Sequence, residues 1–287
     1  MLGITFIGSG SKGNSALLEL NNSYYLLDAG ISCKRITDYI ATRNLSLTDL
    51  KGIFITHEHD DHIKGLKVLL KKVPNITVYC TPGTASAIND KGIFLDSFVE
   101  LDYGKTVLLS DCQCTAFQVP HDAVQPMGLR IEHNNQSMVM ATDLGCVTPD
   151  IIKNTQNADL LCIESNYDED MLRSCSYPSF LKQRIKSKSG HLPNEGVRGI
   201  LSRMNKVPQS IVLMHLSQES NTREKALAAL EPFLEFDGAR FRSVPVTVAS
   251  QDIPTERLVL KDRLPDKLKN NLCNCANSEF FKKEAIV

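Results

Sequence analysis

The sequence contains no tryptophan, and aromatic residues make up only 6% of its 287 positions. Composition therefore gives no sign of base stacking on aromatic side chains, a common device of proteins that bind single strands. Charge of one sign is not in excess either, because 32 basic and 33 acidic residues leave a formal net charge of −1. Any contact with nucleic acid must then come from a local basic patch.

Long apolar runs are also missing. No run approaches the roughly 18 residues of a membrane span, and the N-terminus MLGITFIGSGSKGNS lacks the basic start of a signal peptide. The nine cysteines are scattered and odd in number, which does not suit a disulfide framework. We expect a reduced, soluble, cytoplasmic protein without membrane contact. The pair Cys273 and Cys275 is only weak evidence for a metal.

Apolar residues make up 42% of the chain, enough for a sizeable core. Short apolar or alternating runs predict strands at Ile4–Ile7, Tyr24–Asp28, Gly52–Thr56, Thr77–Cys80, Cys114–Val119, Leu129–Glu132, Ser137–Thr142, Leu160–Glu164 and Ser210–His215. Helical patterns lie at Ile63–Lys72, Thr84–Lys91, Leu181–Ser187, Pro193–Met204 and Thr222–Glu235. We expect a layered α/β (α+β) domain over residues 1–258. Residues 259–287 have poor periodicity and predict a loosely packed or disordered extension.

Three of the seven histidines lie within six residues, in the stretch THEHDDHIKGL. Ile53–Ile55 predicts a buried strand directly before them, and Ile63 and Leu66 open an amphipathic helix directly after. A solvated loop is the simpler interpretation of an isolated pair of histidines. Ligands at a strand-to-helix turn, however, are held on rigid elements and project into a crevice, where an open metal site can form.

The spacing within this stretch predicts two metal positions. His57 and His59 are two apart in an extended segment, so they point the same way and suit one metal. Asp61 and His62 then turn toward a second position. Imidazole with carboxylate suits zinc, and manganese or iron are also accepted. Two ions about 3.5–4 Å apart can generate a hydroxide nucleophile near neutral pH.

The pattern H-x-H-x-D-H resembles the metallo-β-lactamase superfamily. The resemblance implies an αβ/βα sandwich, two β-sheets packed face to face with helices outside. Three later residues are each the first imidazole or carboxylate after a predicted strand: His121, Asp143 and His215. Each alone is an ordinary strand-end residue. Together, in the superfamily's chain order, they predict that His121 completes the first site, His215 the second, and Asp143 bridges the two.

Local signatures narrow the resemblance: GSGSKGNS (8–15), PHDAVQPMGLRIE (120–132), ATDLG (141–145), IESNYDEDML (163–172), GHLPNE (190–195) and HLSQESN (215–221). Together they resemble the bacterial YycJ/WalJ (VicX) family over roughly residues 1–250. The resemblance implies 5′-to-3′ DNA exonuclease activity. It also implies ligand roles for His57, His59, Asp61, His62, His121, Asp143 and His215, and a catalytic or phosphate-contacting role for His191.

Two positions depart from the family pattern. Tyr167 stands where a histidine is expected, and Pro193 stands where serine is usual. The proline removes a backbone donor and a hydroxyl. Neither change touches a predicted ligand, but both put substrate contacts at these positions in doubt.

Contacts to a phosphodiester are predicted at two segments. The loop Gly8–Ser15 supplies backbone donors, and it is not a P-loop because a strand rather than a helix follows. The run 182–188 supplies four cations of the kind that hold phosphates. We assign substrate contacts to Ser11, Asn14, Lys186, Lys188, His191 and Asn194. A tight hairpin turn and a solvated helix face are the respective structural alternatives.

Three other features are interpreted from their neighbours. The lysines at positions 64, 67, 71 and 72 extend the basic patch. His191 has helix capping as its structural alternative. His133 precedes Asn134-Asn135, a good hairpin turn, and predicts a surface turn residue.

The sequence therefore predicts a phosphodiesterase with two divalent metals that contacts the phosphate backbone of nucleic acid, DNA rather than RNA. Asp61 would hold the second metal and help to orient the nucleophile, and His191 would protonate the leaving oxygen. One alternative is a hydrolase of a small phosphodiester or a thioester. Another is a regulatory protein that keeps metal only for structure. Nothing in the sequence indicates an oligomeric state.

Overall fold

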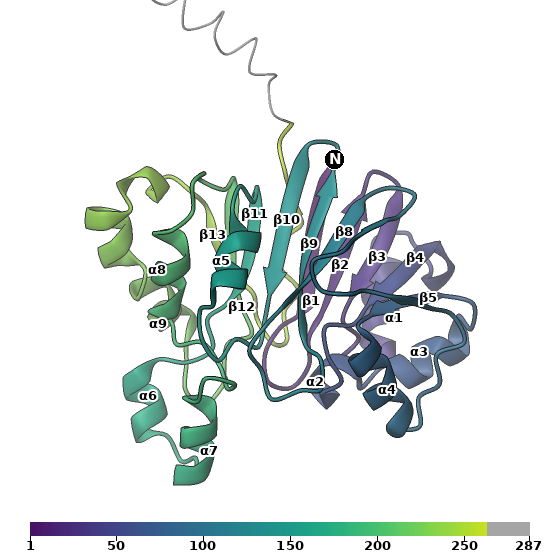
Figure 1. The fold of residues 1–287 in the computed structure, drawn as a ribbon, viewed down its shortest axis with the longest axis horizontal. Coiled ribbons are helices and arrows are strands. Elements are labelled where there is room, and N and C mark those ends of the chain that lie inside the picture. Colours follow the sequence, from purple (N-terminus) through teal and green to yellow (C-terminus); the bar gives the residue numbers. More distant parts are fainter. Residues whose placement is uncertain (263–287) are drawn as a thin grey trace, which may run out of the picture.

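The computed structural model describes residues 1–262 and shows two seven-stranded sheets packed face to face, with helices on both outer sides (Figure 1). The first sheet has the order β14-β1-β2-β3-β4-β5-β6, with bounds Leu258–Val259, Leu2–Gly8, Ser15–Leu20, Ser23–Leu27, Leu50–Phe54, Thr77–Cys80 and Phe98–Glu100. The second has the order β13-β12-β11-β10-β9-β8-β7, with bounds Val246–Val248, Ser210–Met214, Leu160–Glu164, Gln136–Ala141, Met127–His133, Gln113–Gln118 and Thr106–Leu108. The predicted sandwich is confirmed.

Strand β10 shows how one run of apolar residues serves two layers. Met138 and Met140 pack into the core between the sheets. Val139 and Ala141 point the other way, into a second core beneath the helices of the second sheet. Successive strand residues face opposite sides of a sheet, so a strand covered on both sides must be apolar throughout.

The helices form two outer layers and a projecting lobe (Figure 1). Along the chain they are α1 (Cys33–Thr42), α2 (Asp60–Ile63), α3 (Leu66–Lys72), α4 (Pro82–Asp90), α5 (Pro149–Thr155), α6 (Glu169–Ser174), α7 (Ser179–Ile185), α8 (Gly196–Leu201) and α9 (Arg223–Ala228). Helices α1, α3 and α4 cover the first sheet, and α5, α8 and α9 cover the second. Helices α6 and α7 form a separate lobe, the α6–α7 lobe, with a small core that includes Leu172 and Ile185.

The predicted helices needed three corrections. The helix expected over Ile63–Lys72 is interrupted at Gly65, where an added Cβ would lie 2.2 Å from the carbonyl oxygen of Ile31. The helix expected from Thr222 ends at Ala228, and a π-helical turn follows at Phe233–Asp237. Helix α8 begins at Gly196, not at Pro193, because the segment before it pairs with residues near Tyr167.

His133 is not a surface residue. It ends β9, its side chain is buried, and its Nδ1 lies 2.5 Å from the carbonyl oxygen of Asp111. The hairpin turn itself is confirmed, since Asn134 and Asn135 both have positive φ. The asparagines therefore form the turn, while the histidine before them belongs to the sheet.

The chain beyond residue 258 still contributes to the described structure. Strand β14 pairs with β1, and Leu260 is buried in the core between the sheets. The rest of the predicted extension, with Cys273 and Cys275, lies outside the described residues. Within residues 1–262 all seven cysteines are free, and no helix is long or apolar enough to cross a membrane.

Candidate metal centre

The first four predicted ligands lie at the carboxyl end of the first sheet: His57 and His59 in the segment between β4 and α2, and Asp61 and His62 within α2. The backbone at Asp61 is fixed by contacts with Asn14 and Gly30. The amide of Asn14 donates to the carbonyl oxygen of Asp61 at 2.7 Å, and a Cβ at Gly30 would lie 1.6 Å from that same oxygen. Only glycine allows this close approach. The backbone at Asp61 is therefore held against the loops that precede β2 and follow β3 of the first sheet.

The other three predicted ligands follow strands of the second sheet. His121 comes after β8, Asp143 after β10 and His215 after β12. Asp143 and His215 have φ of 57° and 58°, in the left-handed region where aspartate, asparagine and histidine are the enriched residues apart from glycine. This turn redirects the side chain immediately after a buried strand.

The structure brings all seven predicted ligand residues together. The first group contains His57, His59 and His121. Within it, Nδ1 of His59 lies 3.2 Å from Nε2 of His121. In the second group, Oδ2 of Asp61 lies 3.4 Å from Nε2 of His62 and 3.3 Å from Nε2 of His215.

Asp143 joins the two groups. Its Oδ2 lies 3.3 Å from Nε2 of His62, and its Oδ1 lies 3.5 Å from Nε2 of His121. Asp143 therefore lies between the two groups, within 3.5 Å of an imidazole of each.

One buried atom shows that this cluster is not satisfied by the protein alone. Nε2 of His57 is buried and has no hydrogen-bond partner among the described residues. A buried imidazole nitrogen without a partner carries a free-energy cost, and a metal ion would remove it. Histidine and carboxylate ligands of this kind fit zinc, manganese or iron, so the residues present fit a divalent metal pair.

Carboxylates behind the cluster orient the imidazoles. Oδ2 of Asp28 lies 2.8 Å from Nδ1 of His62. Oε1 of Glu164 lies 2.8 Å from Nδ1 of both His215 and His191. Such partners fix which ring nitrogen is free for a ligand bond. We did not assign either acid from the sequence, although each lies at the end of a predicted strand, the same signal that identified Asp143.

The charges of the cluster are strongly coupled. Burial lowers the pKa of His57 well below its usual value. Burial acts on His62 in the same direction, but Asp28 and other carboxylates raise its pKa well above the usual value. Against burial, Asp143 and its neighbours raise the pKa of His215 to about 10. The carboxylates therefore favour positive charge here, which metal cations would supply in place of protons.

The cluster opens into a pocket of about 190 Å³. The metal-facing side chains form one part of its lining, with Ser11, Asn166, His191 and Ser217 beside them. The α6–α7 lobe forms the facing part through Tyr177, Leu181, Arg184 and Ile185. An ion pair between Arg184 and Asp122, with Nε to Oδ2 at 2.6 Å, ties the lobe to the loop that carries His121.

The residues predicted to contact substrate divide into two sets. Ser11 and His191 line the pocket. Asn14 and Asn194 are buried: Nδ2 of Asn14 lies 3.1 Å from Nε2 of His62, and Asn194 bonds to Ser165 and Asn221. Both asparagines hold the site's backbone and side chains in place.

The two predicted lysine contacts lie away from the pocket lining. Lys186 forms an ion pair with Glu169 inside the α6–α7 lobe. Lys188 is exposed in the segment that leads to His191. The two departures from the family pattern meet each other, because Tyr167 and Pro193 form an isolated β-bridge. The ring of Tyr167 is buried in the lobe's small core.

Comparison with known proteins agrees with this geometry. Residues 23–216 match the family described as the beta-lactamase superfamily domain. Exodeoxyribonuclease WalJ of Streptococcus pneumoniae serotype 2 (strain D39) is 39% identical over 227 residues, which cover 77% of this chain and 84% of WalJ. The chain belongs to the WalJ/YycJ family of this superfamily. Exodeoxyribonuclease YycJ of Bacillus anthracis, a second relative in that family, is 33% identical over 240 residues, covering 83% of this chain and 90% of YycJ.

Solved structures of the superfamily share the fold of this WalJ/YycJ family member. The metallo-beta-lactamase fold protein YhfI from Bacillus subtilis superimposes with a TM-score of 0.69 over 89% of this chain and 100% of YhfI, at 15% identity. At that identity the likeness concerns the fold alone.

Proposed function

We propose that this member of the WalJ/YycJ family is a cytoplasmic, metal-dependent phosphodiesterase that removes nucleotides from the 5′ end of DNA. The observation that carries the proposal is the convergence of seven ligand-type side chains from both sheets into two groups joined by Asp143. The names of the relatives WalJ and YycJ support DNA as the substrate. The 5′ polarity rests on the family resemblance.

Each group would hold one divalent ion, zinc or manganese, with iron as a third choice. His57, His59 and His121 would hold the first, and Asp61, His62 and His215 the second, with Asp143 on both. When bound, the pair polarises the phosphodiester and lowers the pKa of water. The side chain of Asp61 is 23% exposed, so one carboxylate oxygen is placed to orient the attacking water.

His191 is the acid in this proposal. Its Nδ1 is bonded to Glu164 at 2.8 Å, and its side chain is 14% exposed at the pocket. That bond leaves Nε2 as the ring atom available to the oxygen that leaves phosphorus. The bond to Glu164 orients the ring for proton donation to the leaving group.

The pocket supports attack at a chain end. Its volume of about 190 Å³ is small, and the α6–α7 lobe stands directly opposite the metal-facing side chains. A terminal nucleotide would occupy this space, with its base toward Tyr177 and Leu181 and its phosphate toward the metals. The hydroxyl of Ser11, a residue that lines the same pocket, would contact the phosphate.

The test uses purified protein loaded with manganese or zinc and a duplex labelled at its 5′ or 3′ end. We expect early release of 5′-terminal nucleotides, and none from an Asp61→Ala variant with unchanged circular dichroism. A parallel RNA duplex measures the preference for DNA. Early release from the 3′ end would overturn the polarity, and no metal-dependent release from DNA or RNA would overturn the nuclease.

The small pocket also favours a second candidate, a hydrolase of small phosphodiesters. Turnover of bis(p-nitrophenyl) phosphate without cleavage of DNA would support it. A purely structural metal site is disfavoured because the cluster lines a pocket open to solvent, whereas structural sites are closed.

A further inference from the structure

Three of the four cations in the basic run 182–188 are already engaged within the protein, and Lys188 is the exception. Arg184 is paired with Asp122, and Lys186 with Glu169. Nζ of Lys182 donates to the carbonyl oxygen of Arg173 at 2.7 Å. These cations build the α6–α7 lobe and attach it to the site. A nucleic acid strand that extends beyond the pocket therefore finds few counter-charges on this run, and a second basic surface would be needed to hold it.

A basic face without counter-charges lies on the segment directly after the ligand motif. Lys64, Lys67 and Lys71 are exposed and form no ion pair among residues 1–262. Leu66 and Leu69, on the opposite side, are buried in the core. Lys67 and Lys71 are spaced i and i+4 on α3 and so share one side of it, and Lys64 is the residue that caps α2 just before α3 begins. Residues 64–72 contain four lysines and no acid.

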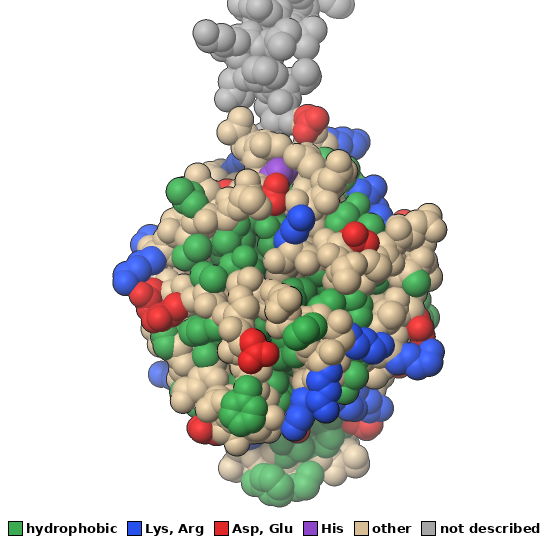
Figure 2. Space-filling model, turned by 90° about the vertical axis from the view of Figure 1, so that its right-hand side faces the viewer, with side chains coloured by type: hydrophobic (Ala, Val, Ile, Leu, Met, Phe, Trp, Pro, Cys, Tyr) green, Lys and Arg blue, Asp and Glu red, His purple; other side chains and the backbone are tan. Residues whose placement is uncertain are grey.

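A hollow beside this face contains an exposed aromatic ring. It measures about 390 Å³ and is lined by Lys67, Lys71, Leu70, Pro74 and Phe94, with Asp96 the one acid in its lining. The side chain of Phe94 is 70% exposed. Figure 2 shows the face of the molecule that carries these helices, with Lys and Arg side chains gathered in its lower part beside hydrophobic ones. Cations flanking an exposed ring are the combination that holds single strands, through phosphates and stacked bases.

The basic face starts on the chain segment that directly follows the ligand motif. Lys64 lies two residues after His62, which is fully buried in the cluster. Lys64 caps α2 and Lys67 and Lys71 lie on α3; at about 1.5 Å per helical residue the face extends about 10 Å. That length corresponds to about three nucleotides at 3.4 Å each.

We propose that Lys64 and the exposed side of α3 with Lys67 and Lys71, together with Phe94, form a tracking surface for a single nucleic acid strand that leads away from the metal centre. The proposal rests on the proposed nuclease function and adds to it a second binding region outside the pocket. Phosphates contact the lysines, and a base stacks on Phe94. A single strand is the occupant because a base must leave its pair to reach the ring.

The test compares a Lys64→Gln/Lys67→Gln/Lys71→Gln variant with two matched triples. One is the arginine triple at the same positions, which keeps the charge. The other is Lys51→Gln/Lys153→Gln/Arg223→Gln, which removes three exposed cations that have no ion pair among residues 1–262. Binding is measured by fluorescence anisotropy on a phosphorothioate strand of about 30 nucleotides with manganese-loaded protein. Kinetics are measured on the ordinary strand and on bis(p-nitrophenyl) phosphate, which is too small to reach α3.

The glutamine triple at α3 should raise KM for the long strand at least about tenfold and reduce the salt slope of binding by about 2, at 0.7 per phosphate contact. Hydrolysis of bis(p-nitrophenyl) phosphate should be unchanged, and the arginine triple should bind like the parent. A Phe94→Ala variant should weaken single-strand binding about tenfold and duplex binding less.

Two contrary results are distinguishable. Equal binding by the two glutamine triples would overturn the tracking surface while leaving the nuclease intact. Binding that depends on the α3 lysines, without any cleavage of the ordinary strand by the parent, would support the surface and overturn the proposed nuclease.

Discussion

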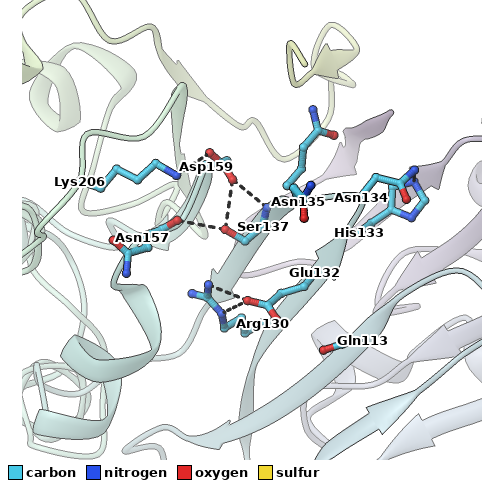
Figure 3. Close-up of a pocket in the computed structure, with 11 residues that line it drawn as sticks. Gln113, Arg130, Glu132, His133, Asn134, Asn135, Ser137, Asn157, Asp159 and Lys206 are labelled. Atoms are coloured by element: carbon cyan, nitrogen blue, oxygen red, sulfur yellow. Dashed lines mark hydrogen bonds and ion pairs between the residues drawn. The ribbon is translucent and has the colours of Figure 1, made fainter. Parts of the chain in front are cut away.

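The two ends of the second sheet both carry hollows lined by titratable side chains. In one hollow these side chains are paired with partners, and in the other a buried polar atom is left without one among residues 1–262. The far hollow, about 450 Å³ in volume, lies beside the β9–β10 hairpin (Figure 3). There Arg130 binds Glu132 at 2.8 Å and two backbone carbonyls, and Lys206 pairs with Asp159 at 3.2 Å. At the metal centre, imidazole nitrogens face one another and Nε2 of His57 has no partner among the described residues.

The difference shows that a polar hollow and a binding site are distinct things. The far hollow closes its hydrogen bonds and ion pairs on itself, so its charges stabilise the fold. At the metal centre, buried imidazole nitrogens lack a hydrogen-bond partner within the described part of the chain or face one another. This costs folding free energy unless a ligand binds there. A search for sites should therefore ask which polar atoms are left unsatisfied as well as where the molecule is concave.

The largest expected effect comes from replacing one histidine in the metal centre and comparing it with the same replacement in the far hollow. His121→Gln should lower kcat/KM on DNA more than about 100-fold, because even changes behind metal ligands cost 10–100-fold. His133→Gln, at the far end, should keep full activity. Activity and bound metal are measured together, the latter by mass spectrometry. Full activity in His121→Gln would remove that residue from the centre.

A smaller effect is expected from the two glutamates. Glu164 orients His191 and His215, so Glu164→Gln keeps the shape but should reduce activity about 10–100-fold. It should also change the pH profile of kcat, because Glu164 is one of the carboxylates that raise the pKa of His215. The matched change Glu132→Gln removes the partner of Arg130 in the far hollow and should leave both kcat and its pH profile unchanged. A Glu164→Gln variant with the parent profile would contradict a positioning role.

The smallest effect should appear only in stability. Arg130→Ala removes hydrogen bonds to the carbonyl oxygens of Asn154 and Gln156 at 2.9 and 2.8 Å. We expect a loss of about 1–2 kcal/mol in the free energy of unfolding, measured by urea titration, with unchanged activity. A large loss of activity would mean that the far hollow takes part in function.

The clustering of the predicted ligand residues was predictable because most of them follow a buried strand and because their chain order matches that of the superfamily. His121, Asp143 and His215 carry this signal singly, and the fold collects them because strand ends meet at one edge of the sandwich. Strands such as β11 are apolar on both faces and stand out in the sequence for the same reason. The short strands β6, β7 and β13 have three residues each, too few for a period to be detected.

The assignments that depend on tertiary contacts were not predictable. A lysine in a basic run looks free until the fold places Glu169 beside Lys186. Arg184 meets an acid 62 positions away in sequence. Asn194 follows a histidine in a loop, yet the fold buries it completely. The partners of the two cations are decided by the packing of the α6–α7 lobe, and Asn194 bonds to Ser165 and Asn221 from other loops; neither kind of contact leaves a periodic pattern in the sequence.

The left-handed backbone at the strand ends has a consequence for how this chain can change. Asp28, Asp143 and His215 all have φ near +57°, where a β-branched or bulky side chain is a genuine outlier. At these positions the backbone conformation alone favours glycine, asparagine, aspartate and histidine over other residue types, whatever the chemistry of the site. New reactions in this lineage would then arise more readily by remodelling the surrounding loops than by replacing these residues.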